Sequence, residues 1–349
     1  PKIFGGILAD RKNKSHMHDL ELIESSEIDI VVVNLYPFVS EAVNNNLPIN
    51  KAIEFIDIGG PSMLRAAAKN HSSVIPICDI KDYNKFIIDY DKYNGDIPVE
   101  VCREYAVKVF QVTFEYDSQI YSYLGKTKQS NKTLPDSLDI NINKDVELRY
   151  GENPHQDAGF YISTNNKKLW SQLQGKELSY NNYTDIESAL SIVLDFKRPA
   201  CSIIKHANPC GFAVGSDISE AFDRAVSCDP ISYFGGIVGF NQMVDVDTAN
   251  KLVEPFLECI VAPDYSDESI KILSKKKNLR LIKVSKEYVF SQFSVKDALG
   301  GYLLQNKDNI SIDFNSFEVP TLIKPDDKML DAMRLGWKLV KYVKSNAIV

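Results

Sequence analysis

The chain has 349 residues, of which 44% are hydrophobic and 25% are charged, and its formal net charge is -7. This balance argues against nucleic acid or an anionic membrane as the main partner, since both select for positive protein surface. Six cysteines without a C-x-x-C pair and the lack of a long apolar run predict a cytoplasmic protein that acts on small molecules. The chain begins at Pro1, not methionine, and its last stretch, KSNAIV, becomes apolar with no polar tail, so we expect an internal piece of a longer protein.

The first 124 residues alternate strand-like apolar runs with helical stretches, which is the rhythm of an open, largely parallel α/β sheet. Buried strands are predicted at 28–35 and 74–78, and a helix is predicted at 61–70 with proline in its first turn. Apolar residues at helical spacing predict a long amphipathic helix at 99–124, which closes the first domain.

Residues 125–145 are rich in Lys, Asn, Ser and Asp, the composition of a solvated linker, and we place a domain boundary there. Beyond it, the capping-box pattern TDIE at 184–187 predicts the start of a helix that runs to Phe196. The α/β alternation then continues, with strands expected at 200–204, 237–240 and 279–284 and helices at 219–226, 248–257, 268–276 and 326–343.

The segment IDIGGPSMLRAAAKNH at 56–71 is the most informative part of the first half. Asp57 leads into Gly59 and Gly60, and the free N–H groups of the following helix suit an oxyanion or a polar ring. Lys69 stands at the far end of that helix, so any contact with Asp57 depends on tertiary geometry. A nearby carboxylate can poise a lysine for proton transfer. The alternative is a plain strand, turn and helix, with Asp57 as a cap and Lys69 in solvent.

Two further segments place polar side chains where ligands commonly bind. Asn34, Tyr36 and Pro37 follow the strong strand in NLYPF, at the edge where α/β sheets bind ligands, although Tyr36 can equally pack beneath a loop. In LRYGENPHQ at 148–156, the planar guanidinium of Arg149 suits a phosphate, with an ordinary surface turn as the alternative.

A sharper signal is IIKHANPCG at 203–211, where a buried strand delivers Lys205 and His206 into a Pro/Gly turn. Successive strand residues face opposite sides, so only departure into the loop lets both side chains reach one ligand. His206 is the best candidate for a general base, because imidazole titrates near neutral pH and the adjacent ammonium favours its neutral form. A structural or exposed histidine is the alternative.

A zinc site is not expected at this turn. His206, Pro209 and Cys210 follow one another as in a zinc deaminase, but that signature requires H-x-E and P-C-x-x-C. Here Asn208 and Ala213 stand at the positions that would need Glu and the second Cys. We therefore predict no metal.

The segment DPISYFGGIVGF at 229–240 places Gly235 and Gly236 between an aromatic pair and a strand. Either the backbone there passes close to a flat ligand, or the glycines form a plain tight turn. The lysine run at 275–277 is interpreted as a solvated helix end, since cations favour helix C-termini.

Six motifs, PKI-x-GGIL, VVVNLYPF, IDIGGPSMLRAAAKNH, LRYGENPHQ, KHANPCG and DPISYFGGIV, occur in this order and span most of the chain. By these motifs the chain resembles the bifunctional family of aminoimidazole carboxamide ribonucleotide (AICAR) formyltransferase and IMP cyclohydrolase. The resemblance implies the last two steps of IMP biosynthesis, which are formyl transfer from 10-formyltetrahydrofolate to AICAR and dehydrative ring closure of formyl-AICAR. It also implies a cytoplasmic homodimer that shares its transformylase sites between subunits.

The same resemblance implies two domains. Residues 1–124 would form the cyclohydrolase, with a methylglyoxal-synthase-like parallel sheet, and 125–145 the linker. Residues 146–349 would form the transformylase, with a cytidine-deaminase-like α/β fold that lacks the zinc.

Site residues follow from the motif match, position by position. In the cyclohydrolase, the resemblance implies catalytic roles for Lys69, Asp57 and Tyr36, with Lys69 moving the proton, and substrate binding by Asn34, Ile58, Gly59 and Gly60. In the transformylase, His206 would accept a proton and Lys205 would support charge. The implied substrate-binding residues there are Arg149, Tyr150, Gly235, Glu258 and Asn346.

The chain also departs from the family pattern. Members usually carry a further start with part of the phosphate site, and a further end that supplies much of the folate pocket, while Phe4 stands where histidine is common. We therefore expect this chain to lack full activity at either site. The competing hypotheses are a non-catalytic nucleotide-binding or assembly fragment of this fold, and a different small-molecule enzyme on the same α/β plan.

Overall fold

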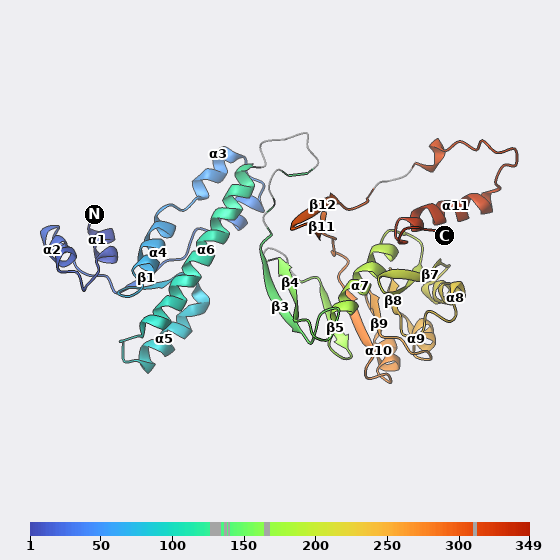
Figure 1. Ribbon diagram of the computed structural model, residues 1–349, viewed down its shortest axis with the longest axis horizontal. Coiled ribbons are helices and arrows are strands. Elements are labelled where there is room, and N and C mark those ends of the chain that lie inside the picture. Colours follow the sequence, from blue (N-terminus) through green and yellow to red (C-terminus); the bar gives the residue numbers. More distant parts are fainter. Residues whose placement is uncertain (126–133, 136–137, 139, 164–167, 310–312) are drawn as a thin grey trace. The chain divides into compact units, whose positions relative to one another are not determined.

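The computed structural model describes residues 1–125, 134–135, 138, 140–163, 168–309 and 313–349. The chain forms two compact units, Pro1–Thr133 and Leu134–Val349 (Figure 1). The division between them falls inside the segment predicted as a linker. Of that segment, residues 126–133, 136–137 and 139 lie outside the described residues, and 142–145 already belong to a strand.

The first unit is built on two parallel strands, β1 (Ile30–Val32) and β2 (Ile75–Ile77). Helices α4 (Gly59–Lys69) and α6 (Val99–Gly125) pack against this pair, and their apolar side chains form one core with those of the strands. The remaining elements of the unit are short: α1 (Lys2–Leu8), α2 (Lys14–Leu22), η1 (Val39–Val43), α3 (Ile49–Ala52), η2 (Ile53–Phe55), η3 (Ile80–Asp82) and α5 (Tyr83–Lys92).

The strand predicted at 28–35 is much shorter in the structure. Leu35 packs against the core of the unit, so the apolar run continues beyond Val32 because of burial rather than strand pairing. The long helix predicted at 99–124 is confirmed, as is the helix predicted at 61–70, which begins two residues earlier at Gly59.

The second unit contains a six-stranded sheet in the order β5-β10-β9-β8-β6-β7. Its three central strands β8, β9 and β10 run parallel, and the flanking strands β5, β6 and β7 pair antiparallel to their neighbours. The strands are β5 (Trp170–Gln174), β6 (Ala200–Lys205), β7 (Asn208–Val214), β8 (Ile237–Phe240), β9 (Cys259–Ala262) and β10 (Arg280–Val284).

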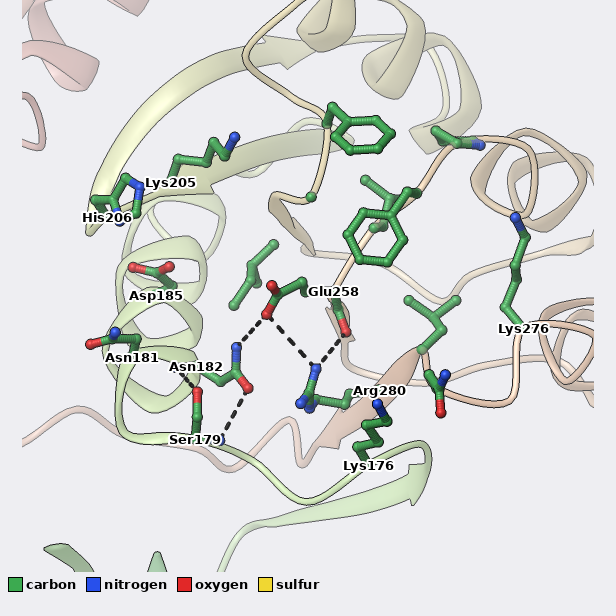
Figure 2. Close-up of a pocket in the computed structure, with 18 of the residues that line it drawn as sticks. Lys176, Ser179, Asn181, Asn182, Asp185, Lys205, His206, Glu258, Lys276 and Arg280 are labelled. Carbon is green, nitrogen blue, oxygen red and sulfur yellow. Dashed lines mark hydrogen bonds and ion pairs between the residues drawn. The ribbon is translucent and has the colours of Figure 1, made fainter. Parts of the chain in front are cut away.

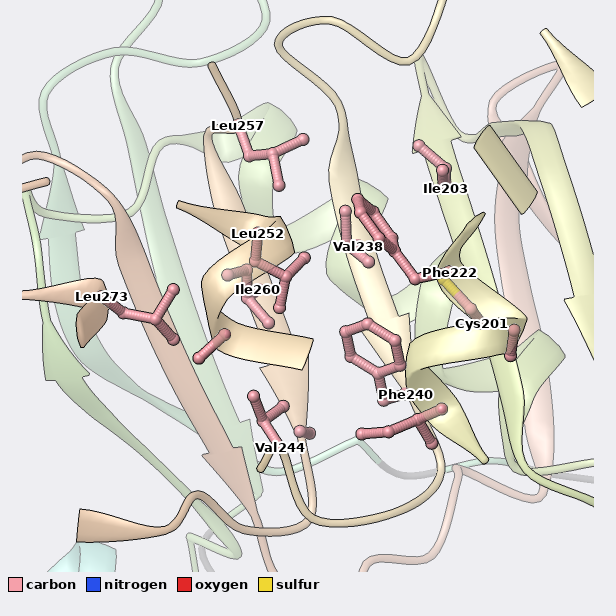
Figure 3. Close-up of a cluster of buried hydrophobic side chains, with 14 of the residues drawn as sticks. Cys201, Ile203, Phe222, Val238, Phe240, Val244, Leu252, Leu257, Ile260 and Leu273 are labelled. Atoms are coloured by element: carbon pink, nitrogen blue, oxygen red, sulfur yellow. The ribbon is translucent and has the colours of Figure 1, made fainter. Parts of the chain in front are cut away.

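Helices cover both faces of this sheet. Helix α7 (Tyr180–Val193) packs on one face, and α8 (Ile218–Cys228), α9 (Val246–Leu252) and α10 (Asp267–Leu273) pack on the other. Side chains alternate between the two faces, because successive residues of a strand point in opposite directions. In β8, Val238 and Phe240 therefore enter the core beneath α8 and α9, as Figure 3 shows, whereas Ile237 joins the core beneath α7.

Two hairpins and a last helix complete the second unit. The hairpins pair β3 (Ile142–Leu148) with β4 (Ala158–Ser163), and β11 (Phe293–Ala298) with β12 (Gly301–Asn306). The second hairpin is followed by η4 (Phe314–Ser316) and α11 (Asp327–Val340). Both units are thus mixed α/β structures, which confirms the predicted class. Among the described residues, no helix has the length and apolarity that a membrane crossing requires.

The capping box predicted at 184–187 is wrong. Helix α7 already begins at Tyr180, where the Ser179 hydroxyl accepts a hydrogen bond from the backbone of Asn182 and the Asn182 side chain accepts one from the backbone of Ser179. An asparagine amide here replaces the Glu or Gln of the usual box, so the pattern at 179–182 was missed. Residues 184–187 consequently lie within the helix, which brings Asp185 to a new position.

The other predicted elements of the second unit are confirmed at their centres and differ at their ends. The strand at 237–240 has the predicted bounds. The helix predicted at 248–257 ends at Leu252, because the residue before a proline disfavours helix and Pro255 follows closely. The helix predicted at 268–276 ends at Leu273, and the one at 326–343 ends at Val340.

Candidate functional site

A cleft of about 750 Å³ lies in the second unit (Figure 2). Its lining comes from segments that are far apart in the sequence: 149–150, 176–185, 205–206, 234–237, 255–258 and 276–280. Of the transformylase residues named above, Arg149, Tyr150, Lys205, His206, Gly235 and Glu258 all line it.

The cleft lies at the amino ends of the parallel strands β8, β9 and β10, because Ile237, Glu258 and Leu279 stand at or just before their first residues. Parallel α/β sheets usually bind ligands at the opposite, carboxyl edge. The difference arises from β6, which runs antiparallel to β8 and so brings its carboxyl end to this edge. Helix α7 also begins at this edge.

The strand β6 ends at Lys205, and His206 and Ala207 form the two-residue turn into β7. Both turn residues have positive φ angles, 54° for His206 and 55° for Ala207. A two-residue hairpin turn with both central residues in this region is of type I′, for which Asn-Gly is the favoured pair. The sequence thus places a histidine at the first turn position, where asparagine is favoured. Backbone strain of this kind is concentrated at functional sites.

Asp185 holds this turn from α7. Its Oδ1 accepts a hydrogen bond from the backbone N–H of Ala207 at 2.6 Å. Burial raises the pKa of the Asp185 carboxyl, and the Ala207 N–H and the nearby His206 oppose that rise. The sequence pattern missed Asp185 because it was assigned to a helix cap.

The raised pKa of Asp185 predicts a pH-dependent stability. At a pH above its pKa in the folded protein, the Asp185 carboxyl is charged in both the folded and the unfolded state, and only the folded state carries the desolvation cost. At a pH below the ordinary value of 3.8, the carboxyl is neutral in both states. The free energy of unfolding therefore falls as the pH rises from the ordinary value of 3.8 through the raised pKa of Asp185 in the folded protein. We expect Asp185→Asn to unfold at higher denaturant concentration than the wild type at pH 7, with the gap closing near pH 3.

Chemical denaturation at a series of pH values measures this difference. Asp331→Asn is the matched control, because Asp331 is exposed in α11 and carries no comparable burial cost. A gap between wild type and Asp185→Asn that is the same at pH 3 and pH 7 would contradict the assignment to burial.

Glu258 is held by two neighbours on the floor of the cleft. Its Oε2 accepts a hydrogen bond from Asn182 Nδ2 at 3.0 Å and lies 3.8 Å from Nη1 of Arg280 (Figure 2). Arg280 is only 8% exposed, and its Nε donates to the carbonyl of Glu177 at 3.1 Å. A buried arginine requires such partners, so Glu258 keeps a fixed orientation toward the cleft.

Gly235 lies beside a pair of exposed aromatic rings. Its φ of +70° favours glycine, and its N–H donates to the carbonyl of Phe256 at 2.7 Å. The rings of Phe234 and Phe256 lie 5.3 Å apart, and both side chains are more than half exposed at the cleft. This pair offers an apolar surface for a planar ring.

The cleft is strongly cationic, because six Lys or Arg side chains and two carboxylates line it. The lysine run is exposed and follows the end of α10 at Leu273, as expected of a solvated helix end, and Lys276 and Lys277 also belong to this lining. The Nε2 of Gln174 donates to the carbonyls of Leu273, Lys276 and Leu279 and thereby ties this lysine segment to β5. The excess of cations suits an anionic ligand such as a phosphate ester.

Asn346 does not line the cleft but follows a residue that contacts the His206 turn. Lys344 donates from its backbone N–H to Asn208 Oδ1 at 3.1 Å and from Nζ to the carbonyl of His206 at 3.0 Å. The chain two residues before Asn346 therefore contacts the turn.

In the first unit, the structure brings Asp57, Tyr36 and Gly60 together. Asp57 accepts hydrogen bonds from the backbone N–H groups of Gly60 at 2.8 Å and of Tyr36 at 3.4 Å. Its own N–H donates to the hydroxyl of Tyr116 at 2.8 Å. A Cβ at position 60 would lie 2.4 Å from an oxygen of Asp57, so a larger residue there would displace the Asp57 carboxylate. Ile58 and Gly59 are exposed beside this cluster.

The structure does not bring Lys69 or Asn34 to this cluster. Lys69 is the last residue of the 11-residue helix α4, which starts beside Asp57, so the two lie about 15 Å apart along the helix axis. Asn34 donates from Nδ2 to the hydroxyl of Tyr83 at 2.9 Å. Phe4 is partly exposed on α1. Each unit thus has a polar cluster. The cleft of the second unit contains more of the residues predicted for its site than the cluster of the first unit does.

No group of three or more His, Cys, Asp or Glu side chains within the described part of the chain could hold a metal ion. Cys210 lies near the turn, but its Sγ donates to the carbonyl of Ile203, and burial raises the pKa of its thiol.

An α/β unit with a cationic cleft, a strained histidine turn and a fixed carboxylate defines an enzyme that acts on a small anionic molecule. Residues 67–349 match the family described as the AICARFT/IMPCHase bienzyme. The bifunctional purine biosynthesis proteins PurH of Bacillus cereus (strain AH820) and Bacillus mycoides (strain KBAB4) are each 45% identical to the chain over 354 residues. The match covers all of this chain and 69% of each relative.

The chain belongs to the AICARFT/IMPCHase bienzyme family. It is thus a member of a family of bifunctional purine-biosynthesis enzymes that pair an AICAR formyltransferase with an IMP cyclohydrolase. Among solved structures, the chain matches the crystal structure of ForH with 29% sequence identity and a TM-score of 0.32, over 37% of this chain and 66% of that one.

Proposed function

We propose that the second unit carries the formyltransferase and the first unit the cyclohydrolase, with 146–349 and 1–124 as the two domains and 125–145 as the linker. The observation that supports this most strongly is the cleft. Six residues implied to serve formyl transfer, five of them from three separate motifs and the sixth being Glu258, line one cationic cavity. Chance would not gather residues from positions 149 to 258 at one edge of a sheet.

In formyl transfer, 10-formyltetrahydrofolate supplies the formyl group as co-substrate. The amine of AICAR forms a bond to the formyl carbon, the bond from that carbon to N10 of the folate breaks, and N10 gains a proton. His206 accepts the proton that the amine loses, and the Lys205 ammonium stabilises negative charge on the formyl oxygen. Both side chains line the cleft from the end of β6 and its turn, which suits action on one reacting centre.

Binding of AICAR is assigned to the rest of the lining. Arg149 and Tyr150, together with the lysines of the cleft, suit the phosphate, and the fixed carboxylate of Glu258 suits a donor group of the base or ribose. The open backbone at Gly235 and the rings beside it suit a planar heterocycle, and Asn346 is a further contact implied by the resemblance.

In ring closure, the carboxamide nitrogen of formyl-AICAR attacks the formyl carbon and water leaves. We assign proton movement to Lys69, Asp57 and Tyr36, and substrate binding to Asn34, Ile58, Gly59 and Gly60. The cluster of Tyr36, Asp57 and Gly60 at the start of α4 supports this assignment, because it brings two of the three residues assigned to proton movement next to each other and beside Gly60. We further propose the methylglyoxal-synthase-like and cytidine-deaminase-like folds for the two units, and a homodimer in the cytoplasm.

The binding assignment is tested with Arg149. A charge-assisted hydrogen bond contributes about 1.5–3 kcal/mol, so Arg149→Ala should weaken AICAR binding by roughly tenfold to a hundredfold in titration calorimetry on the full chain. Arg198→Ala is the matched control, because Arg198 is exposed and pairs with Asp331 away from the cleft. Equal affinities of the two variants would show that the cleft is not the AICAR site.

A further inference from the structure

We infer that Asp185 is a positioning residue for formyl transfer: it holds the His206–Ala207 turn so that the imidazole faces the cleft. The inference rests on the proposed role of His206. It assigns a function to a side chain that lies in the cleft lining, yet belongs to none of the motifs that carry the family resemblance.

The turn needs an external hold because its own backbone is strained. Each non-glycine residue in the left-handed region costs free energy, and two consecutive residues adopt it here, at φ of 54° and 55°. The strands on either side pair as far as Lys205 and Asn208, but their register shifts between Ile203 and Ile204, only two residues before the turn.

Hydrogen bonds from two other segments meet the turn. On one side, the Asp185 carboxylate accepts the Ala207 N–H at 2.6 Å. On the other side, Lys344 Nζ donates to the His206 carbonyl at 3.0 Å. Asp185 is the firmer of the two anchors, because α7 begins with a complete capping box and packs into the core, whereas Lys344 is exposed.

The carboxylate of Asp185 is directed at the turn rather than at a cation. Among the described residues, it forms no ion pair with Lys or Arg, although it is half-buried. A half-buried carboxylate without such a partner is costly, and the hydrogen bond to the Ala207 N–H offsets part of that cost. Figure 2 shows Asp185 on α7 beside His206, with its carboxylate facing the turn.

The test compares Asp185→Ala and Asp185→Asn in the full chain of the enzyme, with formyl transfer and ring closure assayed on the same samples. Asparagine keeps an oxygen that can accept the Ala207 N–H, whereas alanine removes it. Glu187→Ala is the control on the same helix, because the Glu187 carboxylate bonds Tyr288 and Lys307 instead.

We expect Asp185→Ala to lower kcat for formyl transfer by about tenfold to a hundredfold, since a small displacement of a catalytic group has effects of this size. The KM for AICAR should stay within about threefold of the wild type. Asp185→Asn should recover most of kcat, and ring closure and Glu187→Ala should be unchanged. An unchanged KM for AICAR shows that the second unit of the variant is folded, and unchanged ring closure shows the same for the first unit.

Three outcomes would overturn the inference: full kcat in Asp185→Ala, a raised KM at normal kcat, which indicates direct substrate binding, or equal damage by alanine and asparagine. His206→Ala is measured in parallel. If that variant retains formyl transfer, the role of His206 in the proposed function fails. If it is inactive while Asp185→Ala is fully active, only the positioning role of Asp185 fails.

Discussion

His206→Ala should lower the rate of formyl transfer by about a hundredfold to ten-thousandfold, the range that a general base contributes, while ring closure proceeds at its normal rate. The loss arises because alanine cannot accept the proton of the AICAR amine, whose nucleophilicity is weak. Alanine carries a Cβ at position 206 as histidine does, and the hydrogen bonds that Asp185 and Lys344 form with the Ala207 N–H and the carbonyl of residue 206 do not involve the imidazole, so the turn should persist. Steady-state assays of the two steps in a full-length version of the enzyme, each started from its own substrate, measure the effect.

The reciprocal variant is Lys69→Ala in the first unit, which should impair ring closure and leave formyl transfer intact. Lys69 is exposed at the end of α4, so its truncation does not disturb a packed core. If His206→Ala reduces both activities to the same degree, the division of the two reactions between the units is wrong.

Phe240→Ala should lower the free energy of unfolding of the second unit by about 3–5 kcal/mol, the usual cost of truncating a buried phenylalanine. Phe240 is fully buried in β8, and its ring lies 6.4 Å from that of Phe222 of α8 (Figure 3). Removal of the ring leaves a cavity between the sheet and the helices that cover it. Urea or guanidinium denaturation, followed by circular dichroism, measures the loss.

Phe234→Ala provides the matched control, because it removes the same ring from an exposed position. That change should cost about 1 kcal/mol or less, most of it from the contact with Phe256. Similar losses for Phe234→Ala and Phe240→Ala would contradict the description of the core.

Helices and strands with a clear pattern of apolar residues along the chain could be predicted from the sequence. The strand at 237–240 is a continuous apolar run that is buried on both faces, and the helix at 99–124 repeats its apolar residues over many turns. Ends were less predictable, because they depend on single residues. Pro255 shortened α9, and Asn182 completed a capping box that a Glu or Gln pattern does not detect.

Residues of the site could be predicted where they stood in a distinctive motif. Lys205 and His206 were found because a buried strand ended on them, and the cleft contains both. Asp185 and Arg280 were missed, since their relation to the cleft comes from pairing between segments up to about a hundred residues apart rather than from local sequence. Arg280 left one signal: an arginine at the start of an apolar strand needs buried partners.

The β5 to β10 pairing gives the cleft a kinetic consequence. It joins Gln172 to Ile282, and Gln174 fixes the lysine segment only when these two strands meet. Bringing β5 and β10 together closes a loop of about a hundred residues, and this costs conformational entropy before the contacts between the strands form. Pairings of this kind therefore form slowly during folding. During refolding, the ability to bind an anionic ligand should therefore return after most helical structure has already formed.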